Sequence, residues 1–514
     1  MKDHAVPFNR RALLLNAGVN GLAFLAQLAV AFFLAPLLVR HLGRERYGVW
    51  SFIEGFLAYF TLFDLGIAAT LVRYVPKCRA AGDAGLLDRV VSACLFVFSL
   101  AGLVVILLGV VVFSILLFTS AKIPAELRTE AAGLAAISLL CLAATLPLSV
   151  YPAILDGLNR FSTKAMVRTL FLAARVGGTL AVVYFRLGLV SLAAVFALCT
   201  VLEHLVMSWL VERLLPELRA APWRVDRATL KLIRGYSFDS FLAMLAGRVA
   251  FKTDAIVIGL AGHLDLIPFF DMPSRLVEYA KNLIRSGTTT LTPAISALEA
   301  KGGTVKIREL FLNGCRYAMY LALPIQLALV LFGGAFLELW LKDAAYRVQG
   351  QPVLWALAAA LGLAMMQSVA ARVLYGVGKI RWFARLMLLE AGLNLGLSLA
   401  LVGPLGIIGV ALGTAIPNMA MSLVILIQVC RMLEVDASEL WRQSLLRPMV
   451  GVLGLLPLWL GLAHVLPPTG RLSFAALVSV GVLLFAGLAA LLEGGKLPQR
   501  WRARGGAWLL RVGK

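Results

Sequence analysis

The chain has 514 residues, of which 61% are hydrophobic and only 15% are charged. Soluble domains are nearer half apolar and a quarter charged, so this composition excludes a soluble enzyme, a disordered protein and a disulfide-stabilised scaffold. The net charge of +21 would suggest a nucleic-acid partner, but the Lys and Arg residues lie between apolar runs, which indicates membrane orientation instead. The six cysteines form no CxxC pair, so neither a zinc site nor a redox dithiol is predicted. The composition predicts a polytopic membrane protein.

The first apolar run begins like a signal peptide. Arg10 and Arg11 precede it, and Ala29-Val30-Ala31 is similar to a cleavage site. The run continues to Val39, which is well beyond the apolar region of a signal peptide. We therefore expect a retained transmembrane helix.

Apolar runs separated by charged breaks predict fourteen membrane spans. They lie near residues 12–39, 47–72, 90–118, 131–155, 165–185, 188–211, 236–260, 268–295, 309–332, 352–376, 382–402, 405–430, 446–466 and 472–492. The loops on the side shared by the two termini carry about three times as many Lys and Arg residues as the opposite loops. By the positive-inside rule, this bias predicts that both termini are cytoplasmic.

Three glycine-containing segments recur at almost one offset. Gly43 aligns with Gly262, Gly157 with Gly376 and Gly188 with Gly406, and the three separations agree to within one position. Each half then contains an even number of spans, which predicts a parallel repeat with a binding site between the halves. The predicted fold is an all-α integral membrane protein of two six-helix lobes and two extra helices around a central cavity. The corresponding divisions are residues 1–218, 219–440 and 441–514.

Several of these segments resemble one family. The stretch Leu42-Gly43-x-x-x-Tyr47-Gly48, the motif Phe63-Asp64-Leu65-Gly66-Ile67 and the segment 155–161 (LDGLNRF) are similar to signatures of polysaccharide-transport flippases. These flippases belong to the multidrug/oligosaccharidyl-lipid/polysaccharide (MOP) superfamily. The resemblance implies a V-shaped bundle whose central cavity alternates its opening. It also implies movement of an oligosaccharide linked to undecaprenyl pyrophosphate across a bacterial inner membrane, beside polysaccharide assembly proteins.

Other functions stay open on the sequence alone. Multidrug exporters of the superfamily typically have twelve helices, so spans thirteen and fourteen count against them, whereas lipid II flippases also have fourteen. A membrane enzyme acting on lipid-linked sugars should have a sizeable external loop or domain, and all the predicted loops are short. An assembly scaffold should not need charges inside the membrane.

The eighth span carries the densest polar set. Its polar residues recur at intervals of three and four, so they share one face of a helix about 80° wide: Asp271, Arg275, Glu278, Asn282, Arg285 and Thr289, with Lys281 beside them. Arg248 and Lys252 share a face of the seventh span. One interpretation is a cationic cavity wall that binds a pyrophosphate or an acidic sugar. The alternative is an internal ladder of salt bridges, with Asp271 acting only as a helix cap. The surplus of basic over acidic residues on these faces favours the cavity.

The first lobe carries a different polar pattern. Asn16, Asn20 and Gln27 share a face of span one. Tyr47, Ser51, Glu54 and Thr61 share a face of span two, with Asp64 at its edge. These groups are candidates for binding sugar hydroxyls, and Glu54 or Asp64 for proton uptake. The alternative is interhelical hydrogen bonding, with Asp64 bracing a helix end.

A further set of buried polar residues is expected to act more often as partners than as ligands: Arg175, Glu203, Arg316, Arg372, Glu390 and Asn394.

Motifs for energy coupling and catalysis are missing from the sequence. There is no GxxxxGK[ST], HExxH or GxSxG motif, and the five histidines are scattered. The sequence therefore predicts no enzymatic activity, cofactor or metal, and predicts that transport is driven by an ion gradient, the membrane potential or substrate removal. The basic tail, Lys496 to Lys514, is expected to anchor span fourteen on the cytoplasmic side.

Overall fold

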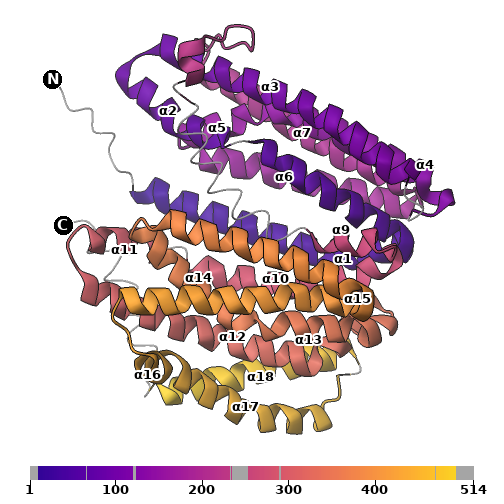
Figure 1. Cartoon of the computed structure of the whole chain (residues 1–514), viewed down its shortest axis with the longest axis vertical. Helices are drawn as coiled ribbons and strands as arrows, with labels where there is room; N and C mark the ends of the chain where they lie inside the picture. The colour runs from indigo at the N-terminus through magenta and orange to yellow at the C-terminus, as the bar shows by residue number, and fades with distance from the viewer. Residues whose placement is uncertain are drawn as a thin grey trace. The chain divides into compact units, whose positions relative to one another are not determined.

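A computed structural model of the chain describes residues 10–64, 66–119, 123–231, 233, 253–288, 291–468 and 470–493. The side chains of residues 10–25, 118, 119 and 380 are outside the description. The described residues form helices joined by short turns and contain no strand (Figure 1). The predicted all-α class is confirmed. Arg248, Lys252, Thr289 and the tail from Lys496 lie outside the described residues, as do the side chains of Asn16 and Asn20.

Ten helices of the described part are long and apolar enough to cross a membrane. Two of them each contain a kink at a glycine with non-helical backbone angles, Gly43 with φ 76° and Gly406 with φ 57°. Backbone angles with positive φ are readily adopted only by glycine. Each of these glycines therefore allows two helical segments to follow one another without a loop. Each of the two candidates thus covers two predicted spans, which is consistent with twelve of the fourteen. Most of predicted span seven lies outside the described residues.

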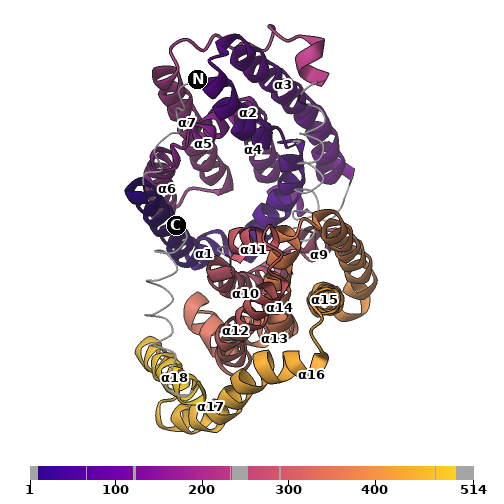
Figure 2. The ribbon, with the colours of Figure 1, turned by 90° about the vertical axis from the view of Figure 1, so that its left-hand side faces the viewer.

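The chain divides into two compact units, Met1–Pro268 and Phe269–Lys514. The described helices of the first unit include α1 (Arg10–Phe60), α2 (Ile67–Ala81), α3 (Ala84–Ser114), α4 (Arg128–Leu148), α5 (Val150–Gly157), α6 (Phe161–Tyr184), α7 (Leu189–Leu214) and α9 (Asp254–Leu260). Short 3₁₀ or π turns complete it: η1 (Thr61–Asp64), η2 (Ile115–Thr119), η3 (Ala125–Leu127) and η5 (Leu264–Leu266). Within this unit α3 packs on α4, α4 on α7, α6 on α1 and α7, and α2 on α5 (Figure 2).

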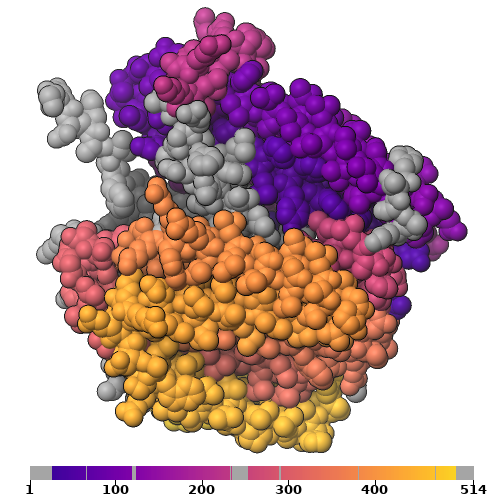
Figure 3. Space-filling model, viewed as in Figure 1, coloured from indigo at the N-terminus to yellow at the C-terminus, as the bar shows by residue number. Residues whose placement is uncertain are grey.

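The boundary between the units falls in the first turn of α10 (Ile267–Thr288), so nearly all of α10 belongs to the second unit, where α11 (Leu291–Glu299) follows it. The second unit continues through α12 (Thr304–Leu341), η6 (Tyr346–Gly350), α13 (Gln351–Ala359), α14 (Leu361–Gly376), α15 (Ile380–Met432), α16 (Ala437–Leu440), η7 (Trp441–Leu445), α17 (Leu446–Val465) and α18 (Arg471–Leu492). Here α14 packs on α11, α12 and α15. Residues of α15, α17 and α18 form part of the surface drawn in orange to yellow in Figure 3. These helices carry exposed apolar side chains such as Leu399, Leu453 and Leu483, as a lipid-facing surface requires.

The helix bounds of the two units repeat at the offset that the glycines predict. The start of α12 corresponds to the start of α3, the start of α15 to that of α6, and the end of α14 to that of α5, each to within one position. The glycines at the ends of α5 and α14 make matching contacts. A Cβ at Gly157 would meet Val75 of α2 at 2.9 Å, and a Cβ at Gly376 would meet Ile295 of α11 at 2.5 Å. The same close helix crossing is therefore built twice.

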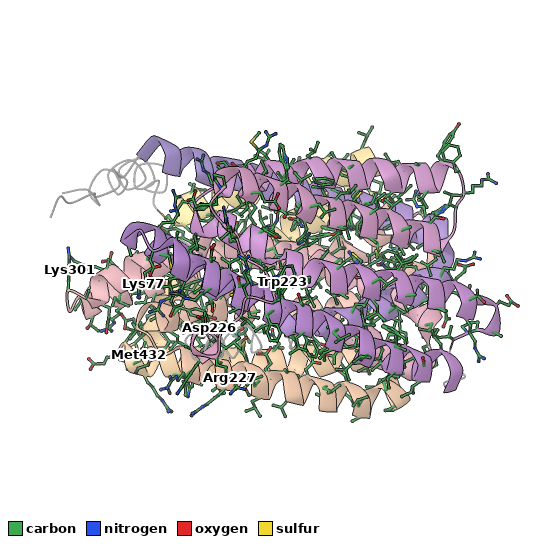
Figure 4. The ribbon with its side chains drawn as sticks, turned by 90° about the horizontal axis from the view of Figure 1, so that it is seen from above. Lys77, Trp223, Asp226, Arg227, Lys301 and Met432 are labelled. Carbon is green, nitrogen blue, oxygen red and sulfur yellow. The ribbon has the colours of Figure 1, made fainter. Side chains whose placement is uncertain are left out.

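Loops that were predicted to share one side of the membrane lie together within each unit. In the first unit the backbone N–H groups of Arg219 and Ala221 donate to Asp88 and Ser92 at 3.0 Å. In the second unit Lys301, before α12, and Met432, at the end of α15, lie at the same end of the helices (Figure 4).

Span two differs from its prediction. It was expected to end near residue 72, but helical structure continues through α2 to Ala81, after an interruption at η1 and Gly66. Gly66 has φ 71°, so the Phe63-Asp64-Leu65-Gly66 motif coincides with a break inside the span. Asp64 Oδ1 accepts a bond from the Ala68 N–H at 3.4 Å, as the bracing alternative predicts.

The last two helices are held to α12 by an aromatic cluster and a buried charge cluster. Trp459 of α17 packs on Phe332 of α12 and donates to the Leu477 carbonyl of α18 at 3.0 Å. Glu493, at the end of α18, pairs with Arg316 of α12 at 3.5 Å and with Arg447 of α17 at 3.4 Å. Arg316, a candidate from the sequence, is therefore a structural partner.

The packing of α17 on α18 generates a stability prediction. A Cβ at Gly481 would lie 2.2 Å from the Trp459 ring, whereas nothing lies within 4 Å of a Cβ at Gly487 of the same helix. We expect Gly481→Ala to lower the free energy of unfolding by about 1–3 kcal/mol through overpacking. Gly487→Ala should be neutral or stabilising by up to ~1 kcal/mol, because alanine favours the helix. Denaturant unfolding of both variants in detergent micelles tests this, and equal effects would contradict the packing described.

Candidate functional site

α10 is a helix with two contrasting faces. Met272, Val277 and Ile284 are buried on one face. The other face presents the predicted polar residues, all of them half-buried: Asp271, Arg275, Glu278, Lys281, Asn282 and Arg285. We call these six residues the α10 stripe. The apolar face packs within the unit, where the rings of Phe269 and Tyr346 lie 4.5 Å apart. Burial of one face thus fixes the side on which the charges emerge.

Part of the α10 stripe is internally paired. Arg285 Nη1 lies 3.5 Å from Glu278 Oε1, as the ladder interpretation predicts, and their side chains remain 31% and 44% exposed. Asp271, Arg275 and Lys281 take part in further polar interactions. The α10 stripe therefore combines ion pairing with partial exposure. Both interpretations, the cationic cavity wall and the ladder of salt bridges, stay open.

A buried polar network on α14 and α15 lies beside the stripe. Glu390 is 5% exposed, accepts a bond from Asn418 Nδ2 at 2.7 Å and lies within electrostatic range of Lys281 and Arg285. Asn394 donates to Thr414 at 3.0 Å, and Ser422 donates to Gln367 at 3.0 Å. Glu390 and Asn394 were candidates from the sequence; Asn418, Ser422 and Gln367 were missed. The spacing of Asn418 and Ser422 by one helical turn in an apolar span was the available signal.

The first unit contains a cavity of about 550 Å³. It is lined from α1, α5, α6 and α7 by Gln27, Asp156, Phe161, Lys164, Ala165, Arg168, Thr169, Leu172, Arg175 and Glu203. Gln27, Arg175 and Glu203 were candidates from the sequence. Lys164 and Arg168 were missed, although with Arg175 they recur at the spacing of one helix face.

Glu54 and Asp64, also predicted in the first unit, are not among these lining residues. Glu54 has an exposed side chain and lies within electrostatic range of Cys141 on α4. Asp64 is half-buried at the start of α2. No group of three or more His, Cys, Asp or Glu side chains suited to a metal occurs within the described ranges.

The exposure of the Glu278–Arg285 pair leads to a quantitative prediction. In a double-mutant cycle with Glu278→Gln and Arg285→Gln, we expect a coupling free energy below about 1 kcal/mol, because the pair is partly solvated. The same cycle on Arg316 and Glu493, which are 11% and 5% exposed, should give roughly 3 kcal/mol. The measurement is denaturant unfolding in micelles. If the coupling free energy of Glu278 and Arg285 is as large as that expected for Arg316 and Glu493, the α10 stripe is a dry ladder of salt bridges.

Solved structures share this fold at low sequence identity. The inward closed structure of the lipid II flippase MurJ is 14% identical with a TM-score of 0.69, over 93% of this chain and 98% of that one. An inward-facing multidrug resistance MATE transporter of the MOP superfamily is 19% identical with a TM-score of 0.67, over 82% and 96%. The MATE transporter VcmN of Vibrio cholerae in its bent form is 15% identical with a TM-score of 0.53, over 82% and 97%.

These likenesses, all below 25% identity, show the fold of the chain. No curated protein sequence matches the chain. Residues 13–299 match the family described as polysaccharide biosynthesis protein, which is more than half of the chain. The chain therefore belongs to the polysaccharide biosynthesis protein family and has a fold similar to those of the MATE transporter and of MurJ.

Proposed function

We propose that the protein is a flippase that carries an anionic lipid-linked oligosaccharide, of the undecaprenyl-pyrophosphate type, across a bacterial cytoplasmic membrane. The observation that carries this proposal is the α10 stripe, a half-buried row of polar and charged side chains on one face of a helix whose other face is apolar. A guanidinium group binds phosphate oxygens in a bidentate manner, so Arg275 and Arg285 suit a diphosphate. Asn282 adds an amide for sugar hydroxyls. Arg248 and Lys252 of span seven extend the proposed binding set.

Alternating access is the proposed mechanism. MATE transporters with this fold have been solved in inward-facing and outward-facing conformations. A transporter of this kind exposes one polar surface to each side in turn, and a partly solvated charged face is the surface that such a cycle needs. We assign no enzymatic step or cofactor to the chain. Glu54 and Asp64 are the proposed coupling groups of the first unit, with Asn16 and Asn20 as polar neighbours on span one.

Lipid II is the second candidate substrate. The similarity to the lipid II flippase MurJ covers 93% of this chain, whereas the similarity to the first MATE transporter covers 82%. Lipid II also carries a diphosphate on a polyprenyl chain, so the α10 stripe suits both substrates. The two candidate substrates differ in their sugars.

Transport by the purified protein in vesicles tests the proposal. Vesicles containing a fluorescent polyprenyl-diphosphate oligosaccharide or lipid II report flipping as the fraction of substrate accessible to an external quencher. We expect Arg275→Ala or Arg285→Ala to slow flipping roughly 10- to 100-fold, the equivalent of losing one charge-assisted contact. Lysine at either position should retain part of the rate because the charge survives.

Arg347→Ala is the matched control. Arg347 is exposed and pairs with Glu338 at 3.5 Å, and neither residue belongs to the α10 stripe. Its loss should leave flipping within about twofold of the wild-type rate, since exposed pairs contribute little. Equal rates for the control and both α10 variants would remove the stripe from the mechanism.

The proposed orientation places both termini and the basic loops in the cytoplasm. The three-part division at residues 218 and 440 and a contact with polysaccharide assembly proteins remain parts of this proposal. A reporter active only outside the cytoplasm should be silent when fused after Lys514 and active when fused near Lys122. Activity after Lys514 would contradict the orientation and the even number of spans.

A further inference from the structure

The cavity of the first unit holds a row of cations that the proposed role of α10 does not use. Lys164, Arg168 and Arg175 recur at intervals of four and seven on α6, so they share a face about 40° wide. They extend over about 16 Å of helix. A volume of about 550 Å³ is within the range of small-molecule sites.

The acids in the cavity do not match these cations one for one. Lys164 Nζ pairs with Asp156 Oδ2 at 2.5 Å. Arg168 Nε lies 3.7 Å from Glu203 Oε1, a loose contact in which the Arg168 side chain is 58% exposed. Two carboxylates thus face three cations in the lining.

Arg175 is the cation of this cavity without a carboxylate partner in the described part of the chain. Its Nη2 donates to Thr200 Oγ1 at 3.0 Å, and its guanidinium lies 5.3 Å from the centre of the Phe196 ring. Its Nε is buried and has no hydrogen-bond partner among the described residues. A buried N–H of a charged group without an acceptor is costly, so an acceptor from a ligand would lower the free energy of the site.

The second unit shows that the fold does not require these charges. At the repeat offset that aligns Gly157 with Gly376, the cations Lys164, Arg168 and Arg175 correspond to Phe383, Met387 and Asn394. The equivalent of the Lys164–Asp156 pair is a contact between the rings of Phe383 and Tyr375, 5.5 Å apart. The same turn is thus stabilised by aromatic packing in one unit and by charges in the other.

We propose that the cavity lined by α1, α5, α6 and α7 binds a phosphoryl group, with Arg175 and Arg168 as its main ligands. A diphosphate has two oxyanion groups and can bridge two guanidinium groups. The incoming oxyanion takes the Arg168 guanidinium from Glu203, and Gln27 and Thr169 line the same space for the remainder of the ligand. The choice of source, the diphosphate of a polyprenyl lipid, rests on the proposed function, and the residues of this cavity are not those of the α10 stripe.

Binding of radiolabelled inorganic pyrophosphate to the full-length protein in micelles tests this site. We expect Arg175→Ala to weaken the high-affinity component at least tenfold and Arg175→Lys to weaken it less. Glu203→Gln should strengthen it, because the competing carboxylate is removed. Thr200→Val, which removes the hydrogen bond but keeps the charge, and Arg46→Ala, which removes an exposed cation paired with Glu130, should stay within about twofold of wild type.

Two results would overturn the proposal. Wild-type affinity in Arg175→Ala would show that Arg175 does not bind the anion. A loss in Thr200→Val equal to that in Arg175→Ala would show that Arg175 only holds α6 to α7. Size-exclusion profiles and unfolding temperatures identify any variant that fails to fold, and Arg175→Lys then supplies the comparison.

Competition identifies the source of the phosphoryl group. Farnesyl pyrophosphate should displace the label in the wild type, and phosphatidylglycerol added to the same micelles should not. Displacement by phosphatidylglycerol alone would overturn the assignment to a lipid diphosphate. Arg285→Ala should leave the Arg175-dependent component unchanged, so the site of the first unit is tested independently of the α10 stripe.

Discussion

The cost of charge inside a membrane is the constraint on which this structure depends. A charged side chain at the centre of a bilayer costs ~2.5 kcal/mol or more, so it must face water, a partner or a ligand. α10 meets this constraint by burying Met272, Val277 and Ile284 and leaving the α10 stripe half-buried. The two-faced character of this helix sets it apart from the apolar spans and makes it the centre of the proposed function.

The two units solve the same constraint with different polar chemistry on one helical plan. The first unit uses ion pairs and a guanidinium around a cavity. The second uses amides and hydroxyls around Glu390, at the positions that correspond to part of that cavity. An apolar frame that occurs twice along the chain thus leaves its interior free to differ. Such a difference between the interiors of the two units suits a transporter whose substrate has a polar part and an apolar carrier lipid.

The sequence predicted the features that depend on local patterns. Apolar length predicted the spans, a glycine offset predicted the repeat, and intervals of three and four predicted the α10 stripe. It did not predict features that arise from packing between distant segments. The extension of span two to Ala81 depends on how α2 packs against α5, and the role of Arg316 depends on Glu493, at the far end of the second unit. Lys164 and Arg168 were missed because they flank the predicted start of a span, where basic residues normally report orientation.

Access of water to the α10 stripe is the central claim, and cysteine labelling measures it most directly. Asn282→Cys lies on the stripe, while Ala280→Cys lies on the buried face of the same helix and serves as the control. The reagent is a membrane-impermeant charged thiol reagent added to intact cells and to inside-out vesicles, with the unsubstituted protein as background for the native cysteines. We predict reaction at position 282 from both sides and little at position 280. If position 282 reacts from neither side, the α10 stripe is not reached by water, and this result would contradict the account.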